Sequence, residues 1–259
     1  MNGVLADSVA TRIDPADRGF TLGDGVFETI RVSDGTPLHA ARHFARLRHG
    51  ADVLGIPLAF GSAAMLRAID DVLNANRLVD AAVRITLSRG PAARGLVPAA
   101  TPKSTLLIGA GPLQQALPPA RLIIATTTRR NELSPLSRIK SLNYLDSILA
   151  RREAEEAGAD DALLLNTAGY VAEATAANVF LLLDGTWITP PEADGALPGI
   201  ARALLLERGV AEERRVFASD VAEARAVFIT NSLGRRAVRA IGPGALDAMH
   251  PALAALPSG

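Results

Sequence analysis

Lys140 is the residue of this sequence that is best placed for covalent chemistry. It lies in SRIKSLNYLDSILARREAEEAG, where an irregular segment gives way to a helical pattern, with Arg138 two residues before it and Arg129 and Arg130 further upstream. A lysine amine that is partly desolvated beside other cations loses its proton readily enough to form an imine with an aldehyde. On its own the segment also fits a solvated lysine at the start of a helix, since most lysines are exposed.

A carboxylate in a second motif could complement that amine. Glu173 ends a short strand in GYVAEATAANVF and is followed by small residues and then by Asn178. A glutamate buried among alanine, threonine and valine costs on the order of several kcal/mol unless it faces a cation. A protonated pyridine nitrogen would be such a cation, whereas the alternative interpretation of Glu173 is an exposed acid at the end of a strand.

Composition narrows the remaining chemistry. The chain of 259 residues has no cysteine, which excludes disulfides, thiolate catalysis and thiolate metal sites, and its four histidines are scattered, which argues against a histidine-rich metal site. We therefore predict no metal. Catalysis must use lysine, arginine, carboxylates, hydroxyls or a bound cofactor.

Charge and hydropathy limit the partners. Lysine plus arginine equals aspartate plus glutamate at 27 each, and the charges are interspersed, so no field is available to hold a nucleic acid or an anionic membrane surface. No apolar run approaches the roughly 20 residues needed to span a bilayer. The start, MNGVLADSVATRID, has neither the basic nor the apolar region of a secretory signal. We expect a cytoplasmic protein that binds neither nucleic acid nor membrane.

The first part of the chain mixes strands and helices. The Asp34-Gly35 pair indicates a hairpin turn after the first strand, and Gly55 ends the first helix. The stretch GPLQQALPPA at 111–120 contains three prolines and a glycine and separates two strand-like runs. We therefore predict a linker at 113–118, a small N-terminal domain at 1–112 and a larger domain at 119–259. Alternation and helical spacing predict strands at 26–32, 83–88 and 104–109 and helices at 39–54 and 62–77.

Closely joined strands dominate the second part. Leu142, Leu145 and Leu149 recur at helical spacing and predict a helix that ends at Gly158. Turns are indicated at 167–169 and at Asp184-Gly185. Together the two parts predict a mixed α/β (α+β) fold class. The other predicted elements are a strand at 121–128, strands on both sides of each turn, a helix at about 199–208 and a strand at 226–231.

The run EATAANVF from Glu173, followed by Thr189 and by LPGIAR at 197–202, resembles the signature of class IV, fold-type IV pyridoxal-phosphate enzymes. That family includes branched-chain aminotransferases, D-amino-acid aminotransferases and 4-amino-4-deoxychorismate lyases. DRGFTLGDGVFETIRV at 17–32 and HFARL at 43–47 also match it, so the likeness runs from about residue 17 to 240. The resemblance implies a two-domain fold of type IV, pyridoxal 5′-phosphate as the cofactor and a homodimer.

The resemblance also assigns roles around the cofactor. Lys140 would carry the cofactor as a Schiff base and move the proton at the substrate α-carbon. Glu173 would pair with the pyridine nitrogen, so that the protonated ring can withdraw electrons. The implied phosphate ligands are the Arg46 side chain, the backbone N–H groups of Ile200 and Ala201, and the Ser232 hydroxyl.

Residues near the substrate are implied by the same likeness. If the helix began at Lys140, Tyr144 would lie one turn beyond it, and its hydroxyl could reach the phenolic oxygen of the cofactor, although a half-buried core tyrosine is the alternative. Arg94, in SRGPAARGLVP, resembles a residue that binds the substrate carboxylate, and Arg31 could assist it. Phe27 stands where D-amino-acid aminotransferases have a tyrosine, and Leu96 where they have a histidine, so strict D-specificity is not implied.

Two reactions fit these residues. One is an aminotransferase that moves an amino group between an amino acid and a 2-oxo acid, and the other is a 4-amino-4-deoxychorismate lyase that releases pyruvate and 4-aminobenzoate. Both begin by removing the same α-proton, so Lys140 and Glu173 do not separate them. Tyr144 and the pair of Arg31 with Arg94 favour the aminotransferase. A non-catalytic pyridoxal-phosphate-binding homologue is the remaining alternative.

Overall fold

The computed structural model describes residues 1–257 and divides the chain into two compact units. The first unit contains residues 1–114 and also 139–143. The second unit contains residues 115–138 and the chain from Tyr144 onward. The chain therefore returns to its first unit for a few residues, and Lys140 lies in that returning segment.

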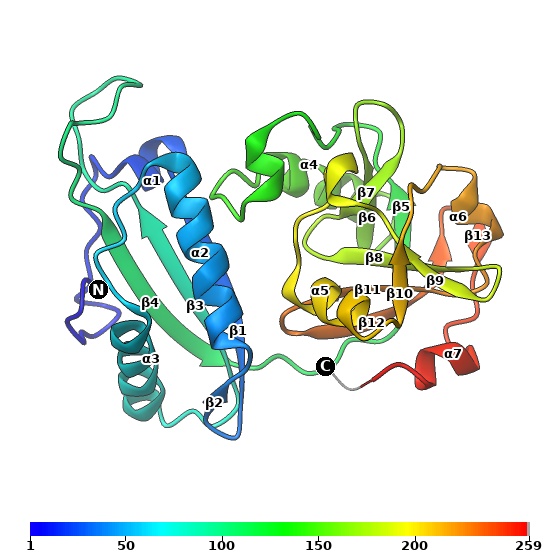
Figure 1. Ribbon diagram of the computed structural model, residues 1–259, viewed down its shortest axis with the longest axis horizontal. Coiled ribbons are helices and arrows are strands. Elements are labelled where there is room, and N and C mark those ends of the chain that lie inside the picture. The colour runs from blue at the N-terminus through cyan, green and yellow to red at the C-terminus, as the bar shows by residue number, and fades with distance from the viewer. Residues whose placement is uncertain (258–259) are drawn as a thin grey trace. The chain divides into compact units, whose positions relative to one another are not determined.

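The first unit is an antiparallel sheet with helices on it (Figure 1). Its strands are ordered β2-β1-β3-β4, and all neighbours run antiparallel. Its elements along the chain are α1 (Arg18–Leu22), β1 (Gly25–Ser33), β2 (Thr36–Pro37), α2 (Ala40–Leu54), α3 (Ser62–Asn76), β3 (Ala81–Ser88) and β4 (Thr105–Pro112).

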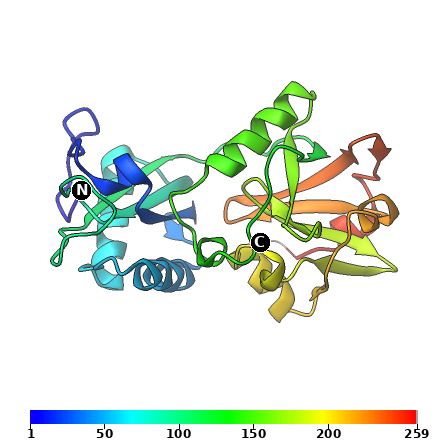
Figure 2. The ribbon, with the colours of Figure 1, turned by 90° about the horizontal axis from the view of Figure 1, so that it is seen from above.

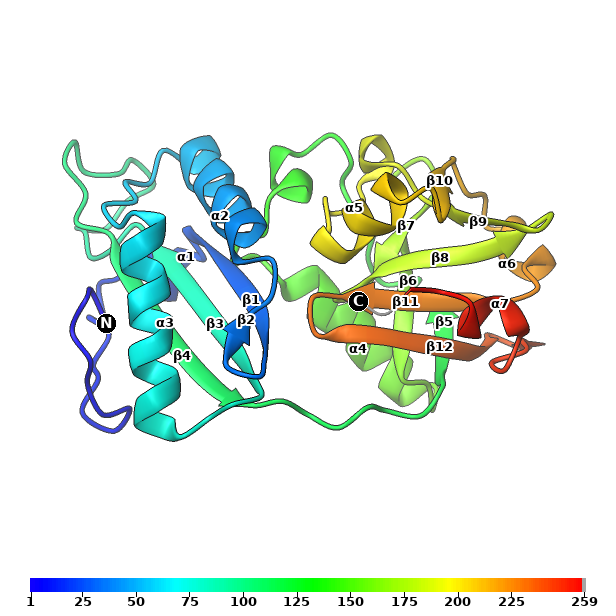
Figure 3. The same cartoon turned by 60° about the horizontal axis from the view of Figure 1, so that its bottom comes forward.

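Alternation along the strands separates the two faces of this sheet. Every second residue of β3, from Ala81 to Leu87, is fully buried, as expected for a strand with one face against a core. Helix α2 packs on β1 and α3 packs on β4, and Figure 3 shows both helices against the same face of the sheet. The opposite face of the sheet is therefore available to functional side chains.

The predicted turn and helix end of this unit are present. Asp34 and Gly35 both have positive φ, at 48° and 72°, which a two-residue hairpin turn of type I′ requires. Gly55 caps α2 in the left-handed conformation with φ of 64°. Aspartate and glycine are among the residues that tolerate a positive φ, which explains their presence at the turn and at the helix end.

The second unit is built on a larger sheet of mixed direction. The main path of its strands is β10-β9-β8-β11-β12-β5-β6-β7, and β13 pairs with β12. Strand β5 runs parallel to both β12 and β6, and β10 runs parallel to β9, whereas the other pairs are antiparallel. The strands are β5 (Ala120–Ile124), β6 (Asp161–Leu165), β7 (Val171–Ala174), β8 (Asn178–Leu183), β9 (Thr186–Thr189), β10 (Ala211–Glu213), β11 (Val227–Asn231), β12 (Gly234–Ile241) and β13 (Gly244–Ala245).

Helices cover both sides of this larger sheet. Figure 2 shows α4, in green, and α5, in yellow, on opposite sides of it. Parallel strands β5 and β6 are joined by the crossover that contains α4, as parallel neighbours require. The helices are η1 (Pro135–Arg138), α4 (Leu145–Glu156), η2 (Glu192–Asp194), α5 (Ile200–Glu207), α6 (Asp220–Glu223) and α7 (Pro251–Ala254).

Helix α4 shows where the leucine pattern misleads. The helix exists, but Leu145 and Leu149 are exposed. Its buried face is made of Ala150 and Ala154, which pack with Ala162 and Leu164 of β6. Small side chains allow this helix to lie close to the strand, so the leucines that reveal the helix are not the residues that attach it.

The described part of the chain has neither a membrane-spanning helix nor a cluster of metal-binding side chains. Among residues 1–257, no helix is long and apolar enough to cross a membrane. Within the same residues, no group of histidine, aspartate and glutamate side chains is arranged to hold a metal ion.

Candidate active site

Lys140 lies in a turn beside β1, not at the start of a helix. The N–H of Phe27 donates to the carbonyl of Lys140 at 2.9 Å, and the N–H of Leu142 donates to Gly25 at 2.9 Å. Ser141 forms an antiparallel bridge with Val26. These contacts fix the backbone on both sides of Lys140, and helix α4 begins only at Leu145, with Tyr144 as its N-cap. The helical spacing expected between Lys140 and Tyr144 is therefore wrong.

The side chain of Lys140 reaches the aromatic face of Phe27. Its Nζ lies 4.3 Å from the ring centroid, and the guanidinium of Arg84 lies 3.9 Å from the same ring. The residue is half-buried. Phe27 and Arg31 alternate along β1 with residues that point to α2, so they share the sheet face that lies away from the helices. The first unit thus brings Lys140 to the face that also carries Phe27 and Arg31.

Arg46 is held by a buried carboxylate. Its Nε and Nη2 donate to the two oxygens of Glu28 at 2.7 Å each, and His43 Nδ1 lies 2.7 Å from Glu28 Oε2. Glu28 is fully buried. The pKa of Glu28 lies below its ordinary value, because hydrogen bonds and charge from Arg46 and His43 lower it more than burial raises it. Glu28 therefore sets the orientation of the arginine for which the family resemblance implies a phosphate contact.

Glu173 is buried in β7 and is not the exposed strand-end acid of the alternative interpretation. Its Oε1 lies 3.0 Å from Arg130 Nε, and its Oε2 accepts from the N–H of Leu197 at 2.9 Å. Arg130 is itself fixed, because it donates to the carbonyls of Gly195 and Ser137 at 3.0 Å each. An ion pair and a backbone donor therefore fix the two oxygens of Glu173.

The turn before α5 is bonded to both Glu173 of β7 and Asn178 of β8. Leu197 gives its N–H to Glu173, and its carbonyl accepts from Asn178 Nδ2 at 2.9 Å. A Cβ added at Gly199 would lie 1.9 Å from Asn178 Oδ1, so any larger residue there would force Asn178 to move. Gly199 is the N-cap of α5 and offers no side chain to the first N–H groups of the helix, which begins at Ile200. The second unit thus brings Glu173 and the positive end of α5 together.

The remaining predicted residues lie on connections. Tyr144 is half-buried at the start of α4, and Ser232 is half-buried in the turn that joins β11 to β12. Ala201 follows Ile200 in the first turn of α5. Arg94 is exposed on the irregular loop between β3 and β4.

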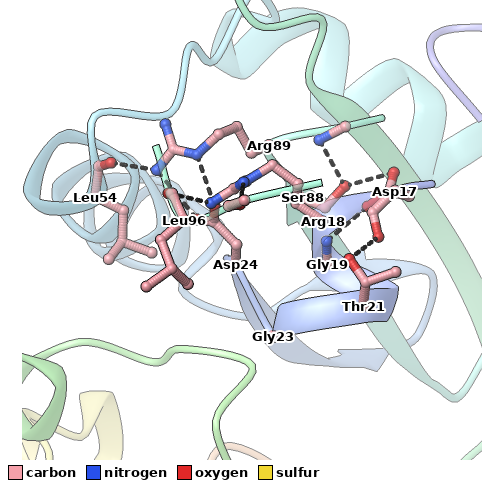
Figure 4. Close-up of polar contacts among 12 residues, drawn as sticks. Asp17, Arg18, Gly19, Thr21, Gly23, Asp24, Leu54, Ser88, Arg89 and Leu96 are labelled. Atoms are coloured by element: carbon pink, nitrogen blue, oxygen red, sulfur yellow. Dashed lines mark hydrogen bonds and ion pairs between the residues drawn. The ribbon is translucent and has the colours of Figure 1, made fainter. Parts of the chain in front are cut away.

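Several positioning residues escaped the sequence interpretation. Arg130 and Asn178 hold the second motif, and Glu28 holds Arg46. In the first unit a further network joins Arg18 and Arg89 through Asp24 (Figure 4). Arg18, Asp24, Glu28, Arg89 and Asn178 all lie in quoted stretches that the family likeness covers, whereas Arg130 does not. Nothing in those stretches indicates which side chains pair with one another, because a pairing becomes visible only in the folded chain.

Comparison with known proteins gives a consistent result. Residues 25–241 match the model of the family described as Amino-transferase class IV. A D-alanine aminotransferase of Bacillus licheniformis is 30% identical over 242 residues, which cover 89% of this chain and 83% of that protein. The crystal structure of 4-amino-4-deoxychorismate lyase from Pseudomonas aeruginosa is 32% identical, with a TM-score of 0.82, and the match covers 95% of this chain and 93% of that one.

A third similar protein is a branched-chain amino acid aminotransferase from Escherichia coli, known from its crystal structure. It is 26% identical, with a TM-score of 0.88, and the match covers 95% of this chain and 87% of that one. These likenesses confirm the predicted fold class, with a small antiparallel N-terminal sheet and a larger mixed C-terminal sheet.

Proposed function

The chain belongs to the class IV aminotransferase family, and we propose that it moves an amino group between an amino acid and a 2-oxo acid with pyridoxal 5′-phosphate as its cofactor. The family match covers most of the chain, and its similar proteins include two kinds of aminotransferase. The single observation that supports covalent attachment of the cofactor, which amino transfer shares with the alternative lyase reaction, is the anchoring of Lys140. A half-buried amine with its backbone bonded on both sides is what a covalent cofactor attachment needs.

The residues present fit this cofactor. The helix end at Gly199 has no side-chain cap and no room for a Cβ, which leaves the N–H groups of Ile200 and Ala201 for a phosphate. Arg46 and Ser232 remain our candidates for further phosphate contacts. When bound, the cofactor supplies a ring that withdraws electrons from the substrate α-carbon.

The chain's own residues then have separate tasks. Lys140 Nζ would attach the cofactor and, once displaced by substrate, take the proton from the substrate α-carbon. Glu173 would hold a proton on the ring nitrogen, and its ion pair with Arg130 keeps the carboxylate in place. Tyr144 would donate to the phenolic oxygen of the cofactor. Arg31 and Arg94 would bind substrate carboxylates, for which a guanidinium is well suited.

A second function is favoured by one comparison. The lyase from Pseudomonas aeruginosa resembles this chain at 32% identity, and lysis of 4-amino-4-deoxychorismate needs the same lysine and glutamate. Tyr144 and the pair of Arg31 with Arg94 lead us to prefer amino transfer.

A half-reaction separates the two. The purified enzyme, loaded with cofactor, is mixed with single D- and L-amino acids while its visible absorption is recorded. Amino transfer predicts that an amino acid bleaches the absorption of the bound aldehyde form and that a 2-oxo acid restores it. If no amino acid bleaches the absorption while aminodeoxychorismate yields pyruvate and 4-aminobenzoate, the lyase is the correct function.

The proposal includes a homodimer as the active form. Light scattering during turnover tests this, since a dimer predicts twice the mass of the 27.0 kDa chain. A monomer that turns over at the full rate would contradict the proposed assembly.

A further inference from the structure

The loop between β3 and β4 is irregular and exposed, yet its middle is fixed to the interior of the first unit. The loop covers 89–104, and Leu96 and Val97 expose 82% and 87% of their surface. Arg18 is only 5% exposed, and its two terminal nitrogens donate to the carbonyls of Gly95 at 2.8 Å and Leu96 at 2.9 Å. A buried arginine therefore holds two consecutive carbonyl groups of an exposed loop.

The start of the same loop is held by backbone pairing with the segment around Arg18. The N–H of Arg18 donates to the carbonyl of Gly90 at 3.0 Å, and the N–H of Ala92 donates to the carbonyl of Ala16 at 3.2 Å. Arg94 lies between this pairing and the carbonyls that the Arg18 side chain binds. Its backbone is thus fastened on both sides by one short segment of chain.

Asp24 holds the guanidinium of Arg18 in place. It accepts from Arg18 Nε and from Arg89 Nε at 2.7 Å each. Arg89 extends the other way and donates to the carbonyls of Gly55 at 2.8 Å and Leu54 at 2.6 Å, at the end of α2 (Figure 4). The pKa of Asp24 lies below its ordinary value, because the hydrogen bonds of Arg89 and Arg18 outweigh the effect of burial, which raises it. One ionised carboxylate thus serves two arginines with different targets.

We propose that Arg18 is a positioning residue for substrate recognition: by fixing the two carbonyls after Arg94, it presents the Arg94 guanidinium to the carboxylate of the substrate. The inference rests on the proposed function, in which Arg94 binds that carboxylate. Within residues 1–257, the side chain of Arg89 bonds to Asp24 and to the end of α2, and not to the part of the loop around Arg94.

The arrangement requires an arginine at position 18. The planar guanidinium offers Nε to Asp24 and both terminal nitrogens to neighbouring carbonyls, in a fixed geometry. A lysine has a single ammonium group on a flexible stem and cannot make the three contacts with the same geometry. Substitution Arg18→Lys therefore tests geometry with the charge retained.

The decisive experiment measures hydrogen exchange of the loop amides in full-length Arg18→Ala, Arg18→Lys and Arg89→Ala proteins. We expect the amides of 92–97 to exchange about 10-fold faster in Arg18→Ala and to be only partly protected in Arg18→Lys. Arg89→Ala is the matched control, because it removes a partner of the same Asp24 but no contact to Gly95 or Leu96. Equal exchange in Arg18→Ala and Arg89→Ala would overturn the inference, and thermal unfolding of each protein verifies folding.

Kinetics connect the loop to substrate. We expect Arg18→Ala to raise KM for the amino acid about 10-fold with kcat changed less than about 3-fold, as loss of a contact shared by ground and transition states does. In the double variant Arg18→Ala/Arg94→Ala, KM should not exceed that of Arg94→Ala, since both act on one contact. Fully additive effects would contradict the inference. Hydrogen exchange needs no substrate, so a protein with a loosened loop and no amino transfer in any form would contradict the proposed function alone.

Discussion

The two units hold their candidate site residues by different means. In the first unit, carboxylates and arginines pair inside the structure: Glu28 orients Arg46, and Asp24 joins Arg18 to Arg89. In the second unit, backbone atoms do more of the work. The N–H and carbonyl of a single residue, Leu197, are bonded by two side chains of the motif on β7 and β8.

This difference predicts different sensitivities. A buried ion pair tolerates little change of charge, because the partner left behind is an uncompensated buried charge. A turn packed against a side chain tolerates little change of volume, because close-packed atoms must move. Charge substitutions should therefore disturb the first unit most, and added volume should disturb the second.

The largest expected effect is a loss of turnover in Lys140→Ala that is not accompanied by a large loss of stability in either unit. Lys140→Ala should lower turnover at least about 10³-fold, because the cofactor attachment and the proton acceptor are both lost. Stability should change by no more than about 1 kcal/mol, since the amine contributes a cation–π contact with Phe27. Lys103→Ala is the matched control, as Lys103 is the other lysine of the sequence. Normal turnover in Lys140→Ala would contradict the assigned role.

Substitution of Glu28 tests the ionic support of the first unit. Glu28→Gln should lower the free energy of unfolding by about 3 kcal/mol, because Arg46 and His43 lose a buried counter-charge. Since the folded pKa of Glu28 lies below its ordinary value of 4.5, its stabilisation is complete above that value and is lost as pH falls through the folded pKa.

Chemical denaturation at several pH values measures both effects. The difference between wild type and Glu28→Gln should be largest near neutral pH and should shrink as the pH falls into the acid range. A difference that does not change with pH would mean that the charge of Glu28 is not what stabilises the unit.

Volume at Gly199 tests the support of the second unit. Gly199→Ala should cost about 2 kcal/mol and weaken cofactor binding, because the new Cβ would meet Asn178 Oδ1 at 1.9 Å. Gly109→Ala in β4 is the control, as a Cβ there has no atom within 4 Å. Thermal unfolding and a cofactor titration followed by fluorescence measure the two effects. If both alanine variants behave alike, packing at the turn is not what the second unit depends on.

The smallest expected effect concerns one buried hydroxyl. Thr189 Oγ1 donates to the carbonyl of Val179 at 2.9 Å, and the residue is fully buried. Thr189→Val keeps the shape and removes the hydrogen bond, so it should cost about 1 kcal/mol without altering turnover. A loss of turnover that exceeds the loss of stability would show that Thr189 also contributes to the site.

Much of the architecture follows from local patterns. Alternation of apolar and polar residues located β1 and β3. Asp34-Gly35 marked the turn after β1, and Gly55 marked the end of α2, because those positions need a particular backbone conformation whatever lies around them. The class IV family and the mixed α/β fold were also predictable, since the motif from Glu173 to Arg202 combines several residues at fixed spacings.

What failed depends on contacts distant in sequence. The leucines of α4 indicated a helix but not its buried side, because the choice of face is made by the strand that the helix meets. Lys140 was expected at the N-terminus of that helix, but it lies in a turn whose backbone bonds to Gly25 and Phe27. Arg18 lies in a stretch that matches the family, but neither it nor Arg130 showed which groups it binds, because an arginine that fixes a loop has the same sequence context as an exposed one.

The return of 139–143 to the first unit has a consequence for synthesis of the chain. The free side of β1 at Gly25–Phe27 is covered only when that segment arrives. At ordinary translation rates this happens on the order of a few seconds after residue 114 has been made. During that interval the nascent first unit has an uncovered strand edge, the kind of surface to which other chains add. Ribosomes that stall between 114 and 139 should therefore release a product prone to aggregation.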